Sequence, residues 1–134
     1  MRLTLALVAV LLVGGIAMTF AQKPAVQAAE KPAQVLRHIV LYKFKDDAKS
    51  ADVQEVIDTF AALPTKIDGI VAFEHGKNVS PEGKSDGLTH VFVVSFKDEK
   101  ARDAYLVHPA HQAYVNVVKD RREKVVVFDY WAAP

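Results

Sequence analysis

The sequence has 134 residues, which suits one compact domain, and it contains no cysteine. A hydrophobic content of 51% excludes a disordered chain, and a formal net charge of +1 excludes the general attraction of a strongly basic protein to nucleic acid. Without cysteine there is no disulfide framework and no lipid anchor on a cysteine, so stability must come from a core and from any partner subunit.

The first 21 residues have the pattern of a secretory signal peptide. One basic residue, Arg2, precedes an almost unbroken apolar run, and small residues close that run at Ala21. The run is also near the length that spans a bilayer, so an uncleaved membrane anchor is the alternative. Because Gly14 and Gly15 interrupt the run, we favour cleavage after Ala21. We therefore expect a secreted or periplasmic protein with no stable membrane insertion after cleavage.

Residues 22–34 (QKPAVQAAEKPAQ) repeat Lys-Pro-Ala and contain no large apolar residue beyond Val26. This composition predicts a flexible, extended linker, with the folded domain over residues 35–134. Once Arg2 leaves with the signal, basic and acidic residues number sixteen each. The mature chain is therefore neutral, and no nucleic-acid partner is expected.

The first half of the domain predicts two strands with a helix between them. Residues 35–44 (VLRHIVLYKF) are rich in β-branched and aromatic residues, with their even positions forming a nearly apolar face. Ser50 is placed to cap a helix whose apolar residues recur at helical spacing and which stops at Leu63-Pro64. Residues 69–78 predict the second strand, and the polar stretch 79–87 predicts a loop.

The second half of the domain also predicts two strands with a helix between them, but this helix is broken. Residues 88–96 (LTHVFVVSF) read as the third strand. Asp98 can cap a short helix through Val107, and Pro109 ends that helix and can open another. Residues 124–131 (KVVVFDYW) read as the fourth strand.

This order predicts an α+β, ferredoxin-like β-α-β-β-α-β fold: a four-stranded antiparallel sheet with helices on one face. Strands 35–44 and 88–96 would be central neighbours. Their odd positions, such as Ile39 and Val91, are apolar too, so the second face of the sheet also needs a cover. Since no further helix is available, we predict a homodimer in which two sheets close against each other as a dimeric α/β barrel.

Two histidines interrupt the apolar faces of the predicted central strands. His38 and His90 occupy even positions, so both are expected to point toward the helices. The alternative is that each is a core histidine held by hydrogen bonds. No pair of histidines has the i, i+4 spacing of a helical metal site, and we predict neither a metal nor a cofactor.

The segment AYLVHPAH (104–111) places further polar groups around the helix break. With Pro109 as the first helical residue, His111 lies in the first helical turn, where the positive helix end favours a neutral ring that can accept a proton. The hydroxyl of Tyr105 can donate to a developing oxyanion. The break could bring Tyr105 and His111 together. The alternative is a helix–helix corner with polar capping, in which His108 caps the second helix.

The stretches RHIVLYKFK (37–45), NVSPEG (78–83), THVFVVSF (89–96), YLVHPAH (105–111) and VVVFDY (125–130) together resemble the stress-responsive dimeric α/β-barrel family, often called Dabb. The resemblance covers residues 35–131 and implies a ferredoxin-like subunit in a barrel-forming dimer. Members include plant stress-induced proteins, bacterial proteins without a known activity and polyketide cyclases.

In cyclase members the second histidine of HPAH is the general base and a preceding tyrosine assists it; by position these are His111 and Tyr105. The resemblance implies that His38 and His90 line the same pocket. Val40, Tyr42 and Phe92 are also predicted to face this pocket.

Three functions remain open at this point. The first is an exported, dimeric protein that binds a small apolar or aromatic molecule between sheet and helices. The second is a cyclase-like enzyme with His111 as base and Tyr105 as oxyanion donor. The third is a structural dimer module. A secretory signal departs from the cytoplasmic cyclases, whose intermediates are made inside the cell.

Overall fold

The computed structural model describes residues 34–132. The predicted signal peptide (1–21) and nearly all of the predicted linker (22–34) lie outside the described residues. The described elements follow the predicted order, and their bounds are β1 (Leu36–Phe44), α1 (Ser50–Ala61), the 3₁₀ turn η1 (Leu63–Thr65), β2 (Ile70–Lys77), β3 (His90–Phe96), α2 (Glu99–Val107), α3 (Pro109–Val118) and β4 (Arg122–Trp131).

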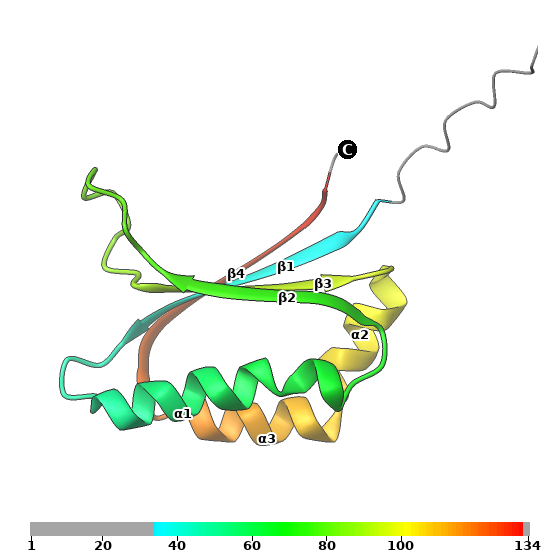
Figure 1. The fold of residues 1–134 in the computed structure, drawn as a ribbon, viewed down its shortest axis with the longest axis horizontal. Coiled ribbons are helices and arrows are strands. Elements are labelled where there is room, and N and C mark those ends of the chain that lie inside the picture. Colours follow the sequence, from blue (N-terminus) through cyan, green and yellow to red (C-terminus); the bar gives the residue numbers. More distant parts are fainter. Residues whose placement is uncertain (1–33, 133–134) are drawn as a thin grey trace, which may run out of the picture. The chain divides into compact units, whose positions relative to one another are not determined.

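The four strands form one antiparallel sheet in the order β2-β3-β1-β4, so β1 and β3 are central neighbours as predicted. The helices lie on one face of this sheet (Figure 1). The ferredoxin-like α+β fold is therefore confirmed. Within residues 34–132, every helix is too short or too polar to cross a bilayer.

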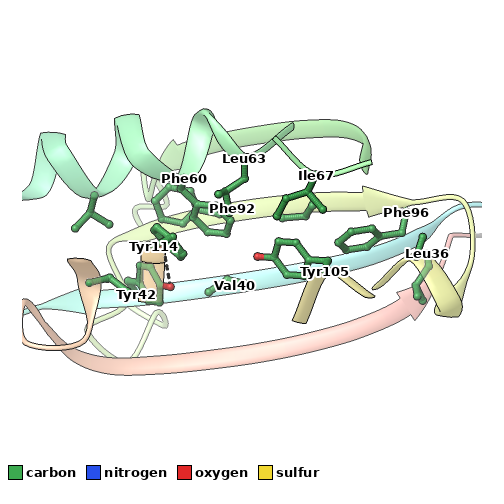
Figure 2. Packing of buried hydrophobic residues seen from close by; sticks show 14 of the residues in the cluster. Leu36, Val40, Tyr42, Phe60, Leu63, Ile67, Phe92, Phe96, Tyr105 and Tyr114 are labelled. Carbon is green, nitrogen blue, oxygen red and sulfur yellow. Dashed lines mark hydrogen bonds between the residues drawn. The ribbon is translucent and has the colours of Figure 1, made fainter. Parts of the chain in front are cut away.

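The core fills the space between the sheet and the helices. Burial alternates along β1, with every even position buried, as expected for a strand whose one face lies against helices. Phe60 of α1 is the centre of this layer: its ring lies 4.8 Å from Phe92 of β3 and 4.3 Å from Tyr114 of α3 (Figure 2). Each such aromatic pair contributes about 0.5–1.5 kcal/mol beyond the area it buries.

The residues predicted to start the helices are confirmed for two of the three helices. Asp98 caps α2, since its side chain accepts a hydrogen bond from the Ala101 amide at 2.7 Å, and Pro109 is the first residue of α3. The predicted Ser50 cap is wrong. Ser50 is already helical, and Lys49 before it holds the cap position without a side-chain hydrogen bond.

The other face of the sheet carries the odd positions of β1 and their neighbours, and no described element covers it (Figure 1). We call this the outer face. Two of its aromatic members are exposed to solvent, Phe128 at 62% and Tyr130 at 41%. Its apolar residues are Ile39, Leu41, Val91, Val93, Val126, Phe128 and Tyr130.

Candidate functional site

The site is built around the break between α2 and α3. His108 has an extended backbone (φ −66°, ψ 136°) between the two helices, and its Nδ1 accepts a hydrogen bond from the Ala110 amide at 3.1 Å. The break and the capping role considered for His108 are both observed. This cap fixes the direction in which α3 leaves the corner, and thereby the position of His111 in its first turn.

Tyr105 and His111 converge across this corner, with ring centroids 4.2 Å apart. Nδ1 of His111 lies 3.1 Å from the carbonyl oxygen of Leu106. Because a carbonyl only accepts, Nδ1 carries the proton, and Nε2 is left as a proton acceptor. Burial lowers the pKa of His111, and the nearby His38 lowers it further, although the bond to Leu106 acts in the opposite direction. His111 is therefore suited to be a neutral base.

The hydroxyl of Tyr105 is the unusual group of the site. The residue is 0% exposed, and within the described part of the chain its hydroxyl has no hydrogen-bond partner. Its ring packs 5.1 Å from Phe96 and 5.7 Å from His38, and in Figure 2 its oxygen points along the core layer toward Tyr42 and Tyr114. Burial raises the pKa of Tyr105, so the group stays protonated and can donate.

His38 is oriented by a carboxylate that the sequence did not single out. Its Nδ1 donates to Oδ1 of Asp129 at 2.7 Å, and the other carboxylate oxygen accepts from Arg102 of α2. His38 and Asp129 are register partners on β1 and β4. With Nδ1 engaged, Nε2 is the ring nitrogen of His38 available toward the cavity. The sequence feature that could have identified this partner is Asp129 itself, a single acid in an otherwise apolar and aromatic stretch of strand.

A cavity of about 190 Å³ lies between these groups and β4. One wall is closed by Tyr42 and Tyr114, whose hydroxyls are hydrogen-bonded at 2.8 Å (Figure 2). The lining residues are His38, Val40, Tyr42, Phe60, Tyr105, Leu106, His111, Tyr114, Val115, Arg122, Val125 and Val127. The cavity is therefore mostly apolar, with its polar groups confined to a few positions.

Five predicted site residues line this cavity, and two do not. Those that line it are His38, Val40, Tyr42, Tyr105 and His111. Phe92 is fully buried beneath Phe60 and contributes to the core instead.

His90 is the second residue outside the cavity, although it lies on the helix side as expected. It pairs with Tyr42, four positions along β1 from His38, which at the rise of a strand is about 13 Å. Its ring packs edge-on against Phe44 at 5.0 Å, at the end of the sheet next to the loop 79–87. The placement of His90 in the same pocket as His111 is therefore corrected.

Within residues 34–132, no three His, Asp or Glu side chains are grouped so as to hold a metal ion. Three of the polar groups around the cavity, Nε2 of His38, Nε2 of His111 and the Tyr105 hydroxyl, instead suit a ligand with one or two hydrogen-bonding atoms.

Comparison with known proteins places these features in context. The family model described as Stress responsive A/B Barrel Domain matches residues 36–132. The stress-response A/B barrel domain-containing protein HS1 of Arabidopsis thaliana is 35% identical over 71% of this chain and 87% of its own length. Olivetolic acid cyclase of Cannabis sativa is 32% identical over 71% of this chain and 94% of its own length.

Among solved structures, a dimeric ferredoxin-like protein from Jannaschia sp. CCS1 superposes with a TM-score of 0.63 and 29% identity. The match covers 72% of this chain and 97% of that one. The relatives of this chain thus include a dimer and an enzyme with nearly the same domain length.

Acidification is expected to lower the free energy of unfolding through His111. Since the folded-state pKa lies below the ordinary 6.5, the unfolded chain binds this proton more readily. The stabilisation is therefore present above about pH 6.5 and is lost as the pH falls toward the folded-state pKa. Urea unfolding at about pH 7.5 and about pH 5 should show a smaller loss in His111→Gln than in the wild type. Equal losses in the two proteins would contradict the assignment.

Proposed function

Because the chain belongs to the stress-responsive A/B barrel domain family, we propose that it is an exported homodimer that binds a small apolar or aromatic molecule in the cavity between sheet and helices. The observation that carries this proposal is the fully buried Tyr105 hydroxyl without a partner in the described chain. A buried polar group left unpaired costs about 1–3 kcal/mol. A ligand that accepts its hydrogen bond would remove that cost.

The shape and chemistry of the cavity support an amphipathic ligand. Valine side chains from β1, β4 and α3 supply apolar walls, whereas His38, Tyr105 and His111 are packed near one another. Specific small-molecule sites commonly combine a mostly apolar lining with a few convergent polar groups. A carbonyl on the ligand would accept from the Tyr105 hydroxyl, and a hydroxyl on the ligand would donate to Nε2 of His111.

The outer face supports the homodimer. It is a continuous apolar surface on a central sheet, with Phe128 among its most exposed side chains. Such faces are seldom left open to water, and the dimeric relative from Jannaschia has the same fold. A second copy of the chain supplies a matching surface by symmetry. Export rests on the pattern of residues 1–21 alone.

Replacing Tyr105 by Phe is expected to weaken ligand binding without weakening the fold. With acetophenone as a neutral one-ring carbonyl probe, followed by NMR titration, affinity should fall about three- to tenfold, because one hydrogen bond is lost. The free energy of unfolding should stay constant or rise by up to about 1 kcal/mol, because the unpaired hydroxyl is gone.

Tyr114→Phe is the matched control, since its hydroxyl is paired with Tyr42 and its loss should lower stability. The proposal fails if acetophenone does not bind the wild type, or if Tyr105→Phe binds it as tightly. Either result would favour a structural dimer module.

A second function, proton abstraction next to a carbonyl, is favoured by one observation: Nε2 of His111 is an unprotonated acceptor, and the His111 ring packs 4.2 Å from the ring of Tyr105, whose hydroxyl can donate. In this step the ligand's C–H bond breaks, the proton passes to Nε2, and the electron pair moves onto the carbonyl oxygen. The hydroxyl of Tyr105 donates to the resulting enolate oxygen. The cyclase relative is consistent with base chemistry in this fold.

The enzyme hypothesis predicts that the protein catalyses exchange of the methyl protons of acetophenone in deuterium oxide. His111→Gln should slow the exchange by about a hundredfold or more, because general bases contribute rate factors of that order. His108→Asn keeps the helix cap and should retain the wild-type rate. Exchange no faster than in buffer would reject the enzyme hypothesis and leave the binding proposal standing.

The homodimer predicts that a charge on the outer face releases monomers. Phe128→Asp would place a carboxylate between the two sheets, so sedimentation equilibrium at micromolar concentration should show a monomer. Val107→Asp puts the same charge on another exposed apolar site, 76% exposed at the end of α2, and should stay dimeric. A wild-type monomer, or a dimeric Phe128→Asp variant, would overturn this interface.

A further inference from the structure

A hollow of about 310 Å³ lies on the outer face, at the end of the sheet next to the loop 79–87. Leu41 and Val91, which are register partners on β1 and β3, line it together with Leu88. The loop rises on the side of the sheet opposite the helices and walls the hollow at its end (Figure 1). This outer-face hollow shares no lining residue with the cavity between sheet and helices.

Contacts within the subunit hold the loop in place beside the hollow. The carboxylate of Asp86 accepts a hydrogen bond from Lys124 of β4, and the amide of Leu88 donates to the carbonyl of Ser85 at 2.9 Å. Asp86 (φ 51°) and Gly87 (φ 78°) both have a left-handed backbone, which turns the chain sharply at this point. The hollow is therefore a preformed feature of the subunit.

Gly76 of β2 leaves the neighbouring side of the hollow open. It is the register partner of Val91, and a Cβ atom added to it would meet no atom of the described subunit within 4 Å. Its φ is not positive, so neither the backbone nor the packing inside the subunit calls for glycine here. A glycine inside a strand often marks a place where another molecule approaches closely.

The outer face also carries a side chain that projects from it. Phe128 of β4 is a large apolar residue exposed to solvent. In a two-fold dimer the same surface meets itself, so a projection and a hollow on one face can fill each other twice. We propose that the Phe128 ring of a second copy of the chain inserts into the outer-face hollow. This inference rests on the proposed homodimer and adds to it the contact that holds the two subunits together.

The size and chemistry of the hollow suit a phenylalanine ring. An apolar cavity of about 150 Å³ holds one benzene molecule, so a hollow of about 310 Å³ admits one ring. Its apolar residues Leu41, Leu88 and Val91 would contact the ring, and no aspartate or glutamate lines it. Large side chains in desolvated pockets are the residues that contribute most to the affinity of an interface.

Strand register limits how the two sheets can face each other. Phe128 is level with Ile39 and Val93, one same-face step of about 7 Å from Leu41 and Val91. A central two-fold axis parallel to the strands would leave Phe128 above β2 of the second copy, and a perpendicular one would leave it above β4. An axis oblique to the strands brings it over the hollow, and the facing strands then cross steeply. Strands in a closed barrel tilt by about 35–45° from its axis, so those on opposite sides also cross steeply.

The test measures the dissociation constant of the dimer by sedimentation equilibrium. Val91→Phe fills the hollow from within, and Phe128→Ala removes the inserted ring. Each should raise the dissociation constant about a hundredfold or more, because every dimer contains the contact twice. The double variant should bind at least about tenfold more tightly than either single variant, because the new ring occupies the space that Phe128 vacated.

Val107→Phe is the matched control, since it adds the same ring to an exposed valine of α2, on the helix side of the sheet. It should leave the dissociation constant unchanged, and urea unfolding should show all variants folded. Gly76→Val is a second way to obstruct the hollow. It should stabilise the subunit, because valine favours a strand and meets open space, and yet weaken the dimer.

Two results overturn the insertion of Phe128 while the homodimer stands. One is a dimer that Val91→Phe and Gly76→Val both leave as tight as the wild type, which would point to a small-molecule occupant of the hollow. The other is a double variant that binds no more tightly than the single variants. A wild-type monomer at micromolar concentration overturns the homodimer together with this inference.

Discussion

The missing amide hydrogen of Pro109 is the constraint on which the candidate site depends. In a continuous helix the amide of residue 109 would donate to the carbonyl of Tyr105, four residues earlier. The carbonyl instead accepts from His108, and the Leu106 carbonyl becomes free to accept from Nδ1 of His111. One absent donor therefore both turns the chain and sets the tautomer of the histidine that follows. Without that turn, residues 105 and 111 would lie on different sides of one helix.

The two faces of the sheet serve two different purposes. The helix-side face carries large aromatic residues that pack the core, together with the polar groups of the cavity. The outer face carries the apolar residues Ile39, Leu41, Val91 and Val93 on its central strands, with Arg37 hydrogen-bonded to Ser95 at one end, which suits a contact between subunits. Because side chains alternate along a strand, neighbouring residues of β1 can contribute to each purpose separately. Ile39 lies on the outer face, and His38 and Val40 on either side of it line the cavity.

The sequence was sufficient for the sheet and its central pair, since the order of strands and helices along the chain predicts both. It also identified the corner, because proline has a local effect that tertiary packing cannot reverse. It was insufficient for distances between strands. The separation of His38 and His90 depends on strand register, which the loop conformation and core packing set together.

Asp129 was missed for a related reason. It is an ordinary surface type in a strand pattern, and its contact with His38 appears only once β4 lies beside β1. The Ser50 error was local: the cap position falls on Lys49, one residue before Ser50, a difference that sequence signals rarely resolve.

The Tyr105 hydroxyl, which has no partner among the described residues, also affects the stability of the whole fold. A ligand that binds only the folded chain shifts the folding equilibrium by mass action, and here it would also satisfy a donor that the empty protein leaves unmet. The fraction of protein with bound ligand and the resistance of the fold to unfolding are thereby coupled. A chain without disulfides would withstand heat or proteases best where its ligand is plentiful, so its abundance would follow the supply of that ligand.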